Sequence, residues 1–356
     1  MDFYMARYIF KRIVSGILVI LGVATIIFLL FIILPTDPAS LTLGQRADIS
    51  TLESINKELG LNEPKSIQFI KYINDLSPLS INGLNDENRE KYHFIPILRF
   101  RNNALVLKWP YLRRSYQSKK KVSEMLMAAL PNTALLAISA FFIASIIGII
   151  FGCLTAIKKG TLLEGALMLL ANVGVSVPSF FAGILISWCF GYLLSSYTGL
   201  SMFGSLYEID PFRGKILAIQ NLILPAIALG IRPLGIITQL TRSSMLEVLS
   251  QDYIRTAKAK GLSPWIIIKK HALSNALNPV LTAVSGWLAS LLAGAFFIEY
   301  IFNWHGLGKM TVDALLSMDF PVVMGAVLFI AIIFVIINIL ADILYGVIDP
   351  RIRAGA

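Results

Sequence analysis

The sequence predicts an all-α polytopic membrane protein with six transmembrane helices. Of its 356 residues, 56% are hydrophobic and 15% are charged, and the mean hydropathy is +0.73. A soluble domain carries about 25% charged residues. Six apolar runs are long enough to cross about 30 Å of hydrocarbon as helices that rise about 1.5 Å per residue. They are residues 13–34, 130–157, 162–194, 217–237, 280–302 and 322–345.

The first run is expected to remain as an uncleaved span. It follows Arg7, Lys11 and Arg12, as the core of a signal peptide would, but no small-x-small cleavage site follows it. It is also longer than the apolar core of a signal peptide, which has about 7–15 residues. The third run contains Pro178 after Gly174. Because proline interrupts a helix, we expect a kink there, which is either a packing kink or a hinge.

Among the short connections between the six predicted spans, those on one side of the membrane contain more Lys and Arg than those on the other side. They hold Lys158, Lys159, Arg242, Arg255, Lys258, Lys260, Lys269, Lys270, Arg351 and Arg353. The opposite short connections hold Arg213, Lys215 and Lys309. Since cytoplasmic loops carry the excess of positive charge, we expect both termini on the cytoplasmic side.

The segment 35–121 is too long to be a bare loop, and we expect it to form a small extracytoplasmic insert. Residues 51–59 and 67–76 are predicted to be short helices, whereas 77–114 is rich in Asn, Pro and charge and gives no clear pattern. The predicted organisation is a first segment and span (1–34), the insert (35–121), a core membrane domain (122–350) with a cytoplasmic loop at 241–278, and a tail (351–356).

Residues 251–279 form a basic segment between two apolar runs, which we call the elbow. They contain residues typical of the starts and ends of helices. Gly261 suits the left-handed position just past a helix end. Ser263 and Pro264 then read as the N-cap and first residue of a new helix. Asn278 and Pro279 repeat this signal. Two short helices joined at Gly261 would suit the docking of a soluble partner, although a basic loop could equally bind anionic lipid.

No enzyme site is visible in the sequence. The stretch 306–309, GLGK, lacks the earlier glycine and the following Ser or Thr of a phosphate-binding loop. The three histidines, His93, His271 and His305, lack metal-ligand spacing. Cys153 and Cys189 both lie in apolar runs, which argues against a disulfide framework. We therefore expect no catalytic residue, metal or cofactor, and the net charge of +10 reflects membrane orientation rather than nucleic-acid binding.

Polar residues inside the spans are costly and often functional. Arg232 lies within the fourth span, beside Pro233. It either lines a translocation path, forms a structural ion pair, or reaches the head groups. Asn338 and Asp342 are one helical turn apart and share a face of the last span, which favours hydrogen bonding between helices. Three residues separate Gly148 from Gly152, a spacing that allows close helix packing, and dimerisation through these glycines is one hypothesis.

The elbow and several other segments match a known family. Residues 253–263 read YIRTAKAKGLS and 271–279 read HALSNALNP. They resemble the cytoplasmic signature loop of ABC importer permeases, and more narrowly the B-type subunit of the dipeptide/oligopeptide/nickel permease family. Further matches are LGLNEP (59–64), LPNTALL (130–136), SVPSFFAGILI (176–186), Glu299, GLG (306–308), DFP (319–321) and DPRIR (349–353). The segment 77–117 is longer and more basic than the resemblance leads us to expect.

The resemblance implies a type I ABC importer transmembrane domain in the inner membrane of a prokaryote. Its partners would be a second homologous permease, two cytoplasmic ABC ATPases that bind the ATP, and an extracytoplasmic substrate-binding protein. The elbow would then be the ATPase-coupling loop. Its implied residues are Tyr253, Arg255, Thr256, Ala257, Lys258, Lys260, Gly261, Leu262, Ser263 and His271.

The resemblance leaves the substrate open, with peptides as the default and nickel or another small solute as the alternative. A secondary transporter would need carboxylates at the middle of the membrane and often has an inverted repeat. A membrane enzyme would need a catalytic set within the spans. The sequence displays neither, so an ATP-driven importer subunit is the expected function.

Overall fold

The computed structural model describes residues 3–33, 63–100, 103–212 and 214–348. The predicted helix at 51–59 and the tail at 351–356 lie outside the described residues. The chain forms two compact units, which we describe separately. One comprises Met1–Ile13, Ala129–Met310 and Ile333–Ala356, and the other comprises Val14–Ala128 and Thr311–Ile332.

The protein is mostly helical, and its candidate spans agree with the predicted fold class. Within the described ranges, four helices are long and apolar enough to cross a membrane, and two bent helix pairs raise the number to six. The four helices are α1 (Phe3–Ile33), α6 (Val122–Ile157), α10 (Ile223–Leu249) and α16 (Phe320–Ile348). The six predicted apolar runs overlap these helices and pairs, but the run 280–302 extends past the second pair, which comprises Pro264–Leu281 and Gly286–Ala293.

The third predicted span is broken rather than gently kinked. Helix α7 (Leu162–Ser176) and the helical run Ser179–Leu193 meet at 116°. That run consists of α8 (Ser179–Ile186) and a π-helical segment, η2 (Ser187–Leu193). Pro178 lies at the break with an extended backbone, ψ 134°. A proline here removes the N–H that would continue the helix, so the predicted kink is present and is large.

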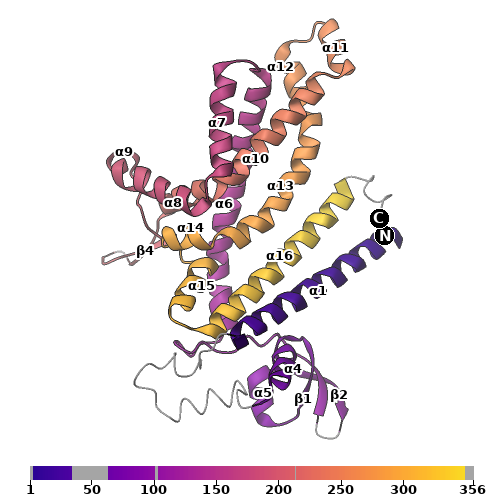
Figure 1. Cartoon of the computed structure of the whole chain (residues 1–356), viewed down its shortest axis with the longest axis vertical. Coiled ribbons are helices and arrows are strands. Elements are labelled where there is room, and N and C mark those ends of the chain that lie inside the picture. The colour runs from indigo at the N-terminus through magenta and orange to yellow at the C-terminus, as the bar shows by residue number, and fades with distance from the viewer. Residues whose placement is uncertain (1–2, 34–62, 101–102, 213, 349–356) are drawn as a thin grey trace. The chain divides into compact units, whose positions relative to one another are not determined.

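The remaining elements of the first unit are short, apart from the helix α13. They are α9 (Ser195–Thr198), a hairpin of β4 (Tyr207–Asp210) and β5 (Gly214–Leu217), η3 (Ile219–Leu222), α11 (Asp252–Ala259), α12 (Pro264–Ile266), π-helical η4 (Ile267–Leu273), α13 (Ser274–Gly294), α14 (Phe296–Ile301) and α15 (Leu307–Leu316), which continues into the second unit. The hairpin is antiparallel and pairs Tyr207 with Leu217. Figure 1 shows α11 and α12 together at one end of α10 and α13.

Glycines bring α10 into close contact with both α6 and α7. A Cβ on Gly148 of α6 would lie 2.9 Å from the Ile237 side chain, and one on Gly152 would overlap Thr241. On the other side, a Cβ on Gly174 of α7 would lie 2.9 Å from the Ile231 carbonyl oxygen. Gly148 and Gly152 therefore serve packing within one chain, and α10 occupies the face that could otherwise serve dimerisation.

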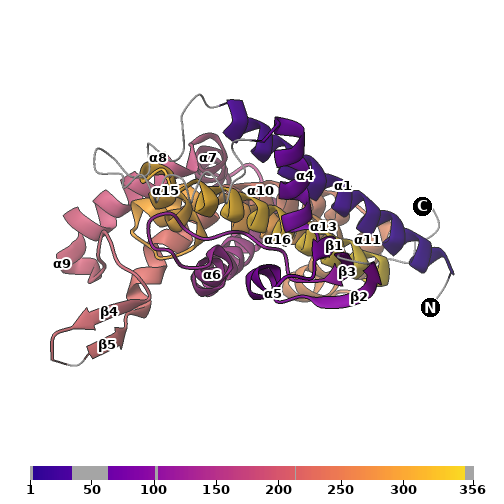
Figure 2. The ribbon, with the colours of Figure 1, turned by 90° about the horizontal axis from the view of Figure 1, so that it is seen from below.

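The insert of the second unit combines two helices with a small sheet that the sequence did not reveal. Its elements are α4 (Lys65–Leu76), β1 (Leu79–Gly83), α5 (Asp86–Tyr92), β2 (Ile95–Phe100) and β3 (Asn103–Leu107). The helix predicted at 67–76 is thus present. The strands are antiparallel in the order β1-β3-β2, and Figure 2 shows them side by side. The buried face of the sheet contains Ala104 and Val106, both fully buried, and also Ser80 and Asn82.

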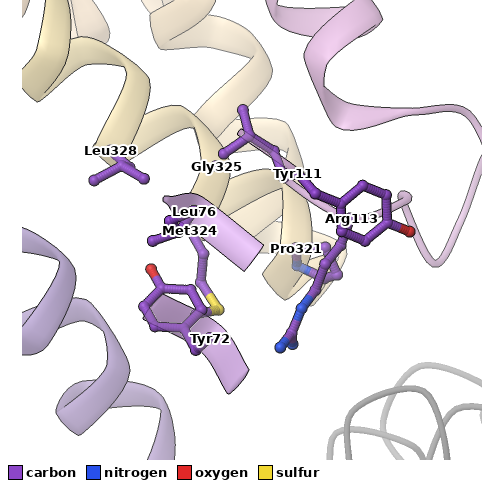
Figure 3. Close-up of a pocket in the computed structure, with 9 residues that line it drawn as sticks. Tyr72, Leu76, Tyr111, Arg113, Pro321, Met324, Gly325 and Leu328 are labelled. Atoms are coloured by element: carbon purple, nitrogen blue, oxygen red, sulfur yellow. The ribbon is translucent and has the colours of Figure 1, made fainter. Parts of the chain in front are cut away.

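A small cavity lies where α4 and the segment 111–113 meet α16. Its lining, drawn in Figure 3, includes Tyr72 and Leu76 of α4 and Met324, Gly325 and Leu328 of α16. Its volume is about 10 Å³, enough for one water molecule. The Tyr72 hydroxyl is buried without a hydrogen-bond partner among the described residues, so an internal water suits this place and a transported solute does not fit.

The insert also buries a lysine among aromatic rings. Lys108 is 5% exposed, and its Nζ makes no hydrogen bond within the described ranges. The Nζ lies 3.8 Å from the centroid of the Tyr92 ring, whose hydroxyl donates to Asp75 Oδ1 at 2.6 Å. Burial lowers the pKa of Lys108 from 10.5 to about 8; Lys91 adds to this shift and Asp75 opposes it.

Lys108 should give the stability of the insert a distinct pH dependence. Between about pH 8 and about 10.5 the unfolded chain keeps this proton and the folded chain releases it, so the free energy of unfolding should rise with pH in that window. Lys108→Met should abolish the rise, and the exposed control Lys120→Met should keep it. Thermal unfolding in detergent at several pH values measures this. An unchanged rise in Lys108→Met would contradict the assignment.

Candidate functional site

The basic elbow has the helix–turn–helix form that Gly261, Ser263 and Pro264 predict. Helix α11 ends at Ala259, and Gly261 has φ +75°, a left-handed conformation that glycine adopts without steric cost. Ser263 is extended, and Pro264 opens α12. Asp252 lies in the first turn of α11 and Lys258 in the last. Both charges therefore interact favourably with the helix dipole and stabilise α11.

The predicted second helix start at Asn278 and Pro279 is wrong. Helix α13 begins at Ser274 and continues through Pro279. Ala276 and Val280, on either side of the proline, are both fully buried in apolar clusters. Packing on both sides of Pro279 thus holds the helix together despite the missing N–H.

The elbow is fixed to the membrane helices by a small apolar core. From α11, Ile254 is fully buried and Ala257 is 6% exposed. They pack in one cluster with Ala156 of α6, Met245 of α10, and Ile267, Ala272 and Ala276 from the helices that follow. Ala257, one of the implied coupling residues, is therefore an anchor of α11 and has no free surface to offer a partner.

The opposite side of the elbow is exposed and basic. Arg255, Thr256, Lys258, Lys260 and Ser263 are all exposed, and Leu262 is partly buried. Arg255 forms an ion pair with Asp252 on its own helix, at 3.2 Å. Trp265 and Ile266 add apolar surface, with 68% and 42% of their area exposed. Sequence reasoning missed these two, because they open an apolar run and resemble its buried members.

Tyr253 ties the first elbow helix to the second half of the elbow. Asn275 Nδ2 donates to the Tyr253 hydroxyl at 3.0 Å and to the carbonyl oxygen of His271 at 2.9 Å. His271 thus takes part through its backbone, and its side chain is partly buried. These bonds hold α11 against η4.

An ion pair joins the base of the elbow to the start of α7. Arg242 Nε donates to Glu164 Oε1 at 3.0 Å, and a second guanidinium N–H donates to the same oxygen. The other oxygen of Glu164 accepts from the N–H of Gly160 at 2.5 Å. Thr161 caps α7 through the N–H of Glu164. Helix α10 is therefore connected to the α6–α7 turn as well as to the elbow.

Arg232 lies on the exposed stripe of α10. Ser243, three helical turns further along the same stripe, is also exposed. Gln239, between them, donates to Asn172 of α7 at 2.9 Å. Arg232 makes no ion pair or hydrogen bond with the part of the chain that the structure describes. A lipid-facing helix would not carry such a polar stripe, so this side suits a partner subunit or water.

The two polar residues of the last span have different surroundings. Asp342 accepts from Arg12 Nε of α1 at 3.0 Å and so joins two helices. Asn338 donates to the carbonyl oxygen of Phe334 on its own helix at 2.8 Å. An interhelical role for Asn338 stays a prediction.

A buried carboxylate organises the turn before α15. Glu299 is fully buried and accepts from Thr133 Oγ1 at 2.6 Å, from the Gly308 N–H at 2.7 Å and from the Lys309 N–H at 3.1 Å. A Cβ on Gly306 would overlap this carboxylate. The N–H groups belong to the first turn of α15, where a negative charge is favourable. Sequence reasoning named Glu299 and this turn only through the resemblance.

Comparison with known proteins now identifies the family. The family model "Binding-protein-dependent transport system inner membrane component" matches residues 148–354, and its N-terminal companion matches residues 5–80. The chain belongs to this family. It is a multi-pass permease subunit of the inner membrane, has no catalytic activity of its own, and works with partner ATPases that handle ATP and with a binding protein. A secondary transporter or a membrane enzyme is thereby excluded.

Relatives of this permease share nearly its whole length. A Brucella abortus protein named as a peptide transport system permease is 40% identical over 98% of this chain and 99% of the relative. The dipeptide transport system permease proteins DppB of Alkalihalophilus pseudofirmus and Bacillus subtilis are each 35% identical over 98% of this chain and 100% and 98% of theirs. A chain of the MetNI methionine ABC transporter, solved in inward-facing conformations, has a TM-score of 0.48 at 16% identity and covers 64% of this chain and 97% of its own.

Removing the Glu299 carboxylate should destabilise this permease. Glu299→Ala would remove the acceptor of the Thr133 O–H and of two backbone N–H groups, and each buried donor that loses its acceptor costs about 1–3 kcal/mol. The melting temperature in detergent should therefore fall by several degrees, and by less in Glu299→Gln, which keeps one acceptor oxygen. The exposed control Glu247→Ala should melt like the wild type. Equal melting of Glu299→Ala and Glu247→Ala would overturn this account.

Proposed function

We propose that this permease forms one half of the translocation path of an ATP-driven peptide importer, paired with a second, related permease. Relatives named for peptide or dipeptide transport match it from end to end at 35–40% identity, and this match carries the substrate proposal. We keep the organisation predicted from the sequence: a first span (1–34), an insert (35–121), a core (122–350) with a coupling loop (241–278), and a tail (351–356).

In this proposal the exposed face of the elbow contacts an ATPase. Arg255, Lys258 and Lys260 supply charge for polar contacts, and Trp265 supplies apolar area of the kind that anchors protein interfaces. The buried side of α11 packs on the ends of α6 and α10. A push on α11 therefore moves these helices with it, because interdigitated side chains resist compression.

Specific contacts connect the elbow to the membrane-spanning helices. Helix α10 carries the force towards the membrane, and the Glu164–Arg242 pair passes it to α7. The glycine contacts keep α6, α7 and α10 together as one body. Closure of the ATPase dimer would then tilt this body as a unit, which is the rigid-body form of alternating access. The elbow and both termini lie in the cytoplasm in this scheme, as the distribution of Lys and Arg indicates.

Arg232 is assigned to the path. It is exposed, unpaired within the described ranges and next to the polar Asn172–Gln239 pair. A cation on the wall of a path would attract the carboxylate of a peptide, and a guanidinium binds carboxylates through two parallel N–H groups. Peptides suit this wall better than divalent nickel, which a cation would repel.

Changes at Gly261 should separate the backbone requirement of the elbow from its surface. Gly261→Val would place a β-branched residue at φ +75°, which is strained, so uptake should fall and ATPase activity should no longer respond to the binding protein. Gly261→Asn should retain most activity, since asparagine tolerates this conformation. Uptake and ATPase assays in proteoliposomes measure both. Normal coupling in Gly261→Val would contradict the assignment of the elbow as the coupling loop.

Charge reversal should test the surface itself. Arg255→Glu keeps the buried side of α11 intact but opposes the charge of the proposed contact, so coupling should fall by about tenfold or more. Lys269→Glu, also exposed but on η4 rather than α11, serves as the matched control. Co-purification of the ATPase subunits should weaken in Arg255→Glu and persist in the control. Equal retention of the ATPases in both variants would contradict the proposed face.

Arg232→Gln should lower peptide uptake while leaving ATPase stimulation in place. A lost charge-assisted hydrogen bond, about 1.5–3 kcal/mol, corresponds to roughly ten- to a hundredfold. Arg232→Lys should retain part of the uptake, and peptides with amidated C-termini should be affected less than free acids. If Arg232→Gln transports both kinds of peptide at the wild-type rate, Arg232 does not contact the substrate.

A further inference from the structure

The sheet of the insert is apolar on its outward face. Pairing places Leu79 opposite Leu107, and Leu107 opposite Ile95, in one row across the three strands. These side chains are 54%, 46% and 67% exposed. Neighbouring rows add Ile81, Leu98 and Phe100, and Trp109 follows the sheet; all four are more than half exposed. An extended apolar patch of this kind marks a surface that meets another apolar phase.

The contacts of α4 show which part of helix α1 the insert reaches. The ring of Phe28 in α1 lies 5.0 Å from that of Phe69 and 5.6 Å from that of Tyr72. Tyr72 also packs in one cluster with Ala24 of α1 and Leu328 of α16. Ala24 precedes the end of the α1 candidate span at Phe31 by seven residues, or about 10 Å.

Helix α4 therefore reaches the level of the hydrocarbon, and the insert does not stand clear of the membrane. On its free side α4 exposes Ile67 and Ile70, one turn apart, by 42% and 66%. The adjoining part of α1 also exposes apolar surface: only 17% of its apolar window is buried, and Leu18 and Ile26 are 65% and 59% exposed. The exposed apolar side of α4 thus adjoins an apolar helix that is a candidate membrane span.

The charge of the insert fits the same environment. Residues 63–121 contain twelve Lys or Arg and five Asp or Glu, so they hold +7 of the net charge of +10. Basic segments next to a membrane are attracted to anionic head groups, and exposed tryptophan is typical of the interface between lipid and water. A binding protein that associates and leaves would expose the patch to water in every cycle, whereas the bilayer covers it permanently.

We propose that the outward face of the β1-β3-β2 sheet, with Trp109 and the free side of α4, lies on the bilayer surface and contacts anionic phospholipid. Figure 1 shows β1 and β2 next to α4, which adjoins the lower part of α1. The insert would then be a membrane-bound foot that holds the outer ends of α1 and α16. This inference rests on the membrane location of the permease and not on its substrate.

Spin labels on the full chain test this contact. In a background of Cys153→Ser and Cys189→Ser, single cysteines replace Ile81 or Ile95, with Ile17 as the lipid-facing reference and Lys120 as the exposed reference. The labelled permease is reconstituted in vesicles of phosphatidylethanolamine and phosphatidylglycerol. Collision with oxygen relative to a water-soluble nickel chelate should place labels 81 and 95 between the value of Ile17, which lies within the α1 span, and the value of Lys120. Values equal to that of Lys120 would overturn the proposal.

Two further arms distinguish the occupants of the face. Replacing phosphatidylglycerol by phosphatidylcholine should shift both labels towards the Lys120 value, and no shift would remove the anionic lipid from the proposal. Adding the binding protein should leave both labels unchanged. If instead they become shielded only when the binding protein is present, the face is a protein-docking surface and the proposal is wrong. Retained uptake by the labelled permease shows that the labels leave the fold intact.

Discussion

The close contact of α10 with α6 and α7 is the constraint on which the first unit depends. Lipid provides no hydrophobic force between helices, so association in the membrane relies on close packing of small residues. Glycines on all three helices provide that contact here. Once α10 is held on two sides, its end fixes where the elbow begins, and its one free stripe fixes where Arg232 must face. Both parts of the proposed mechanism, coupling and path, follow from this packing.

Three acidic groups of the first unit connect separate segments of the chain. Glu299 is satisfied by one hydroxyl and two N–H groups, Asp342 by Arg12, and Glu164 by Arg242. Each pair or network joins segments far apart in the sequence, so these charged groups hold helices together. Arg232 alone among the charges that lie well inside the candidate spans has no such partner in the described ranges. That difference, rather than its charge, is why we propose Arg232 for the translocation path.

Much of the helical framework could be predicted from the sequence, because apolar length is a local property. The left-handed turn at Gly261 and the break at Pro178 were also predictable, since each depends on the chemistry of one residue. The sheet of the insert was not, because in β1 the polar Ser80 and Asn82 point inwards and Leu79 and Ile81 point outwards, against the usual pattern. The partners of Glu299 and the burial of Ala257 were equally hidden, because both depend on residues distant along the chain.

The break in the third span has a consequence for how the backbone meets the lipid. Helix α7 has 15 residues, about 22 Å, which is less than the hydrocarbon thickness of about 30 Å, so a membrane helix of this length breaks before it has crossed. A broken helix normally leaves N–H groups that lipid cannot satisfy. Here the Val177 N–H bonds Val173, and the Ala182 N–H bonds the carbonyl of Pro178. Pro178 has no N–H at all, so the residue that breaks the helix also removes one of the donors that the break would have left without a partner.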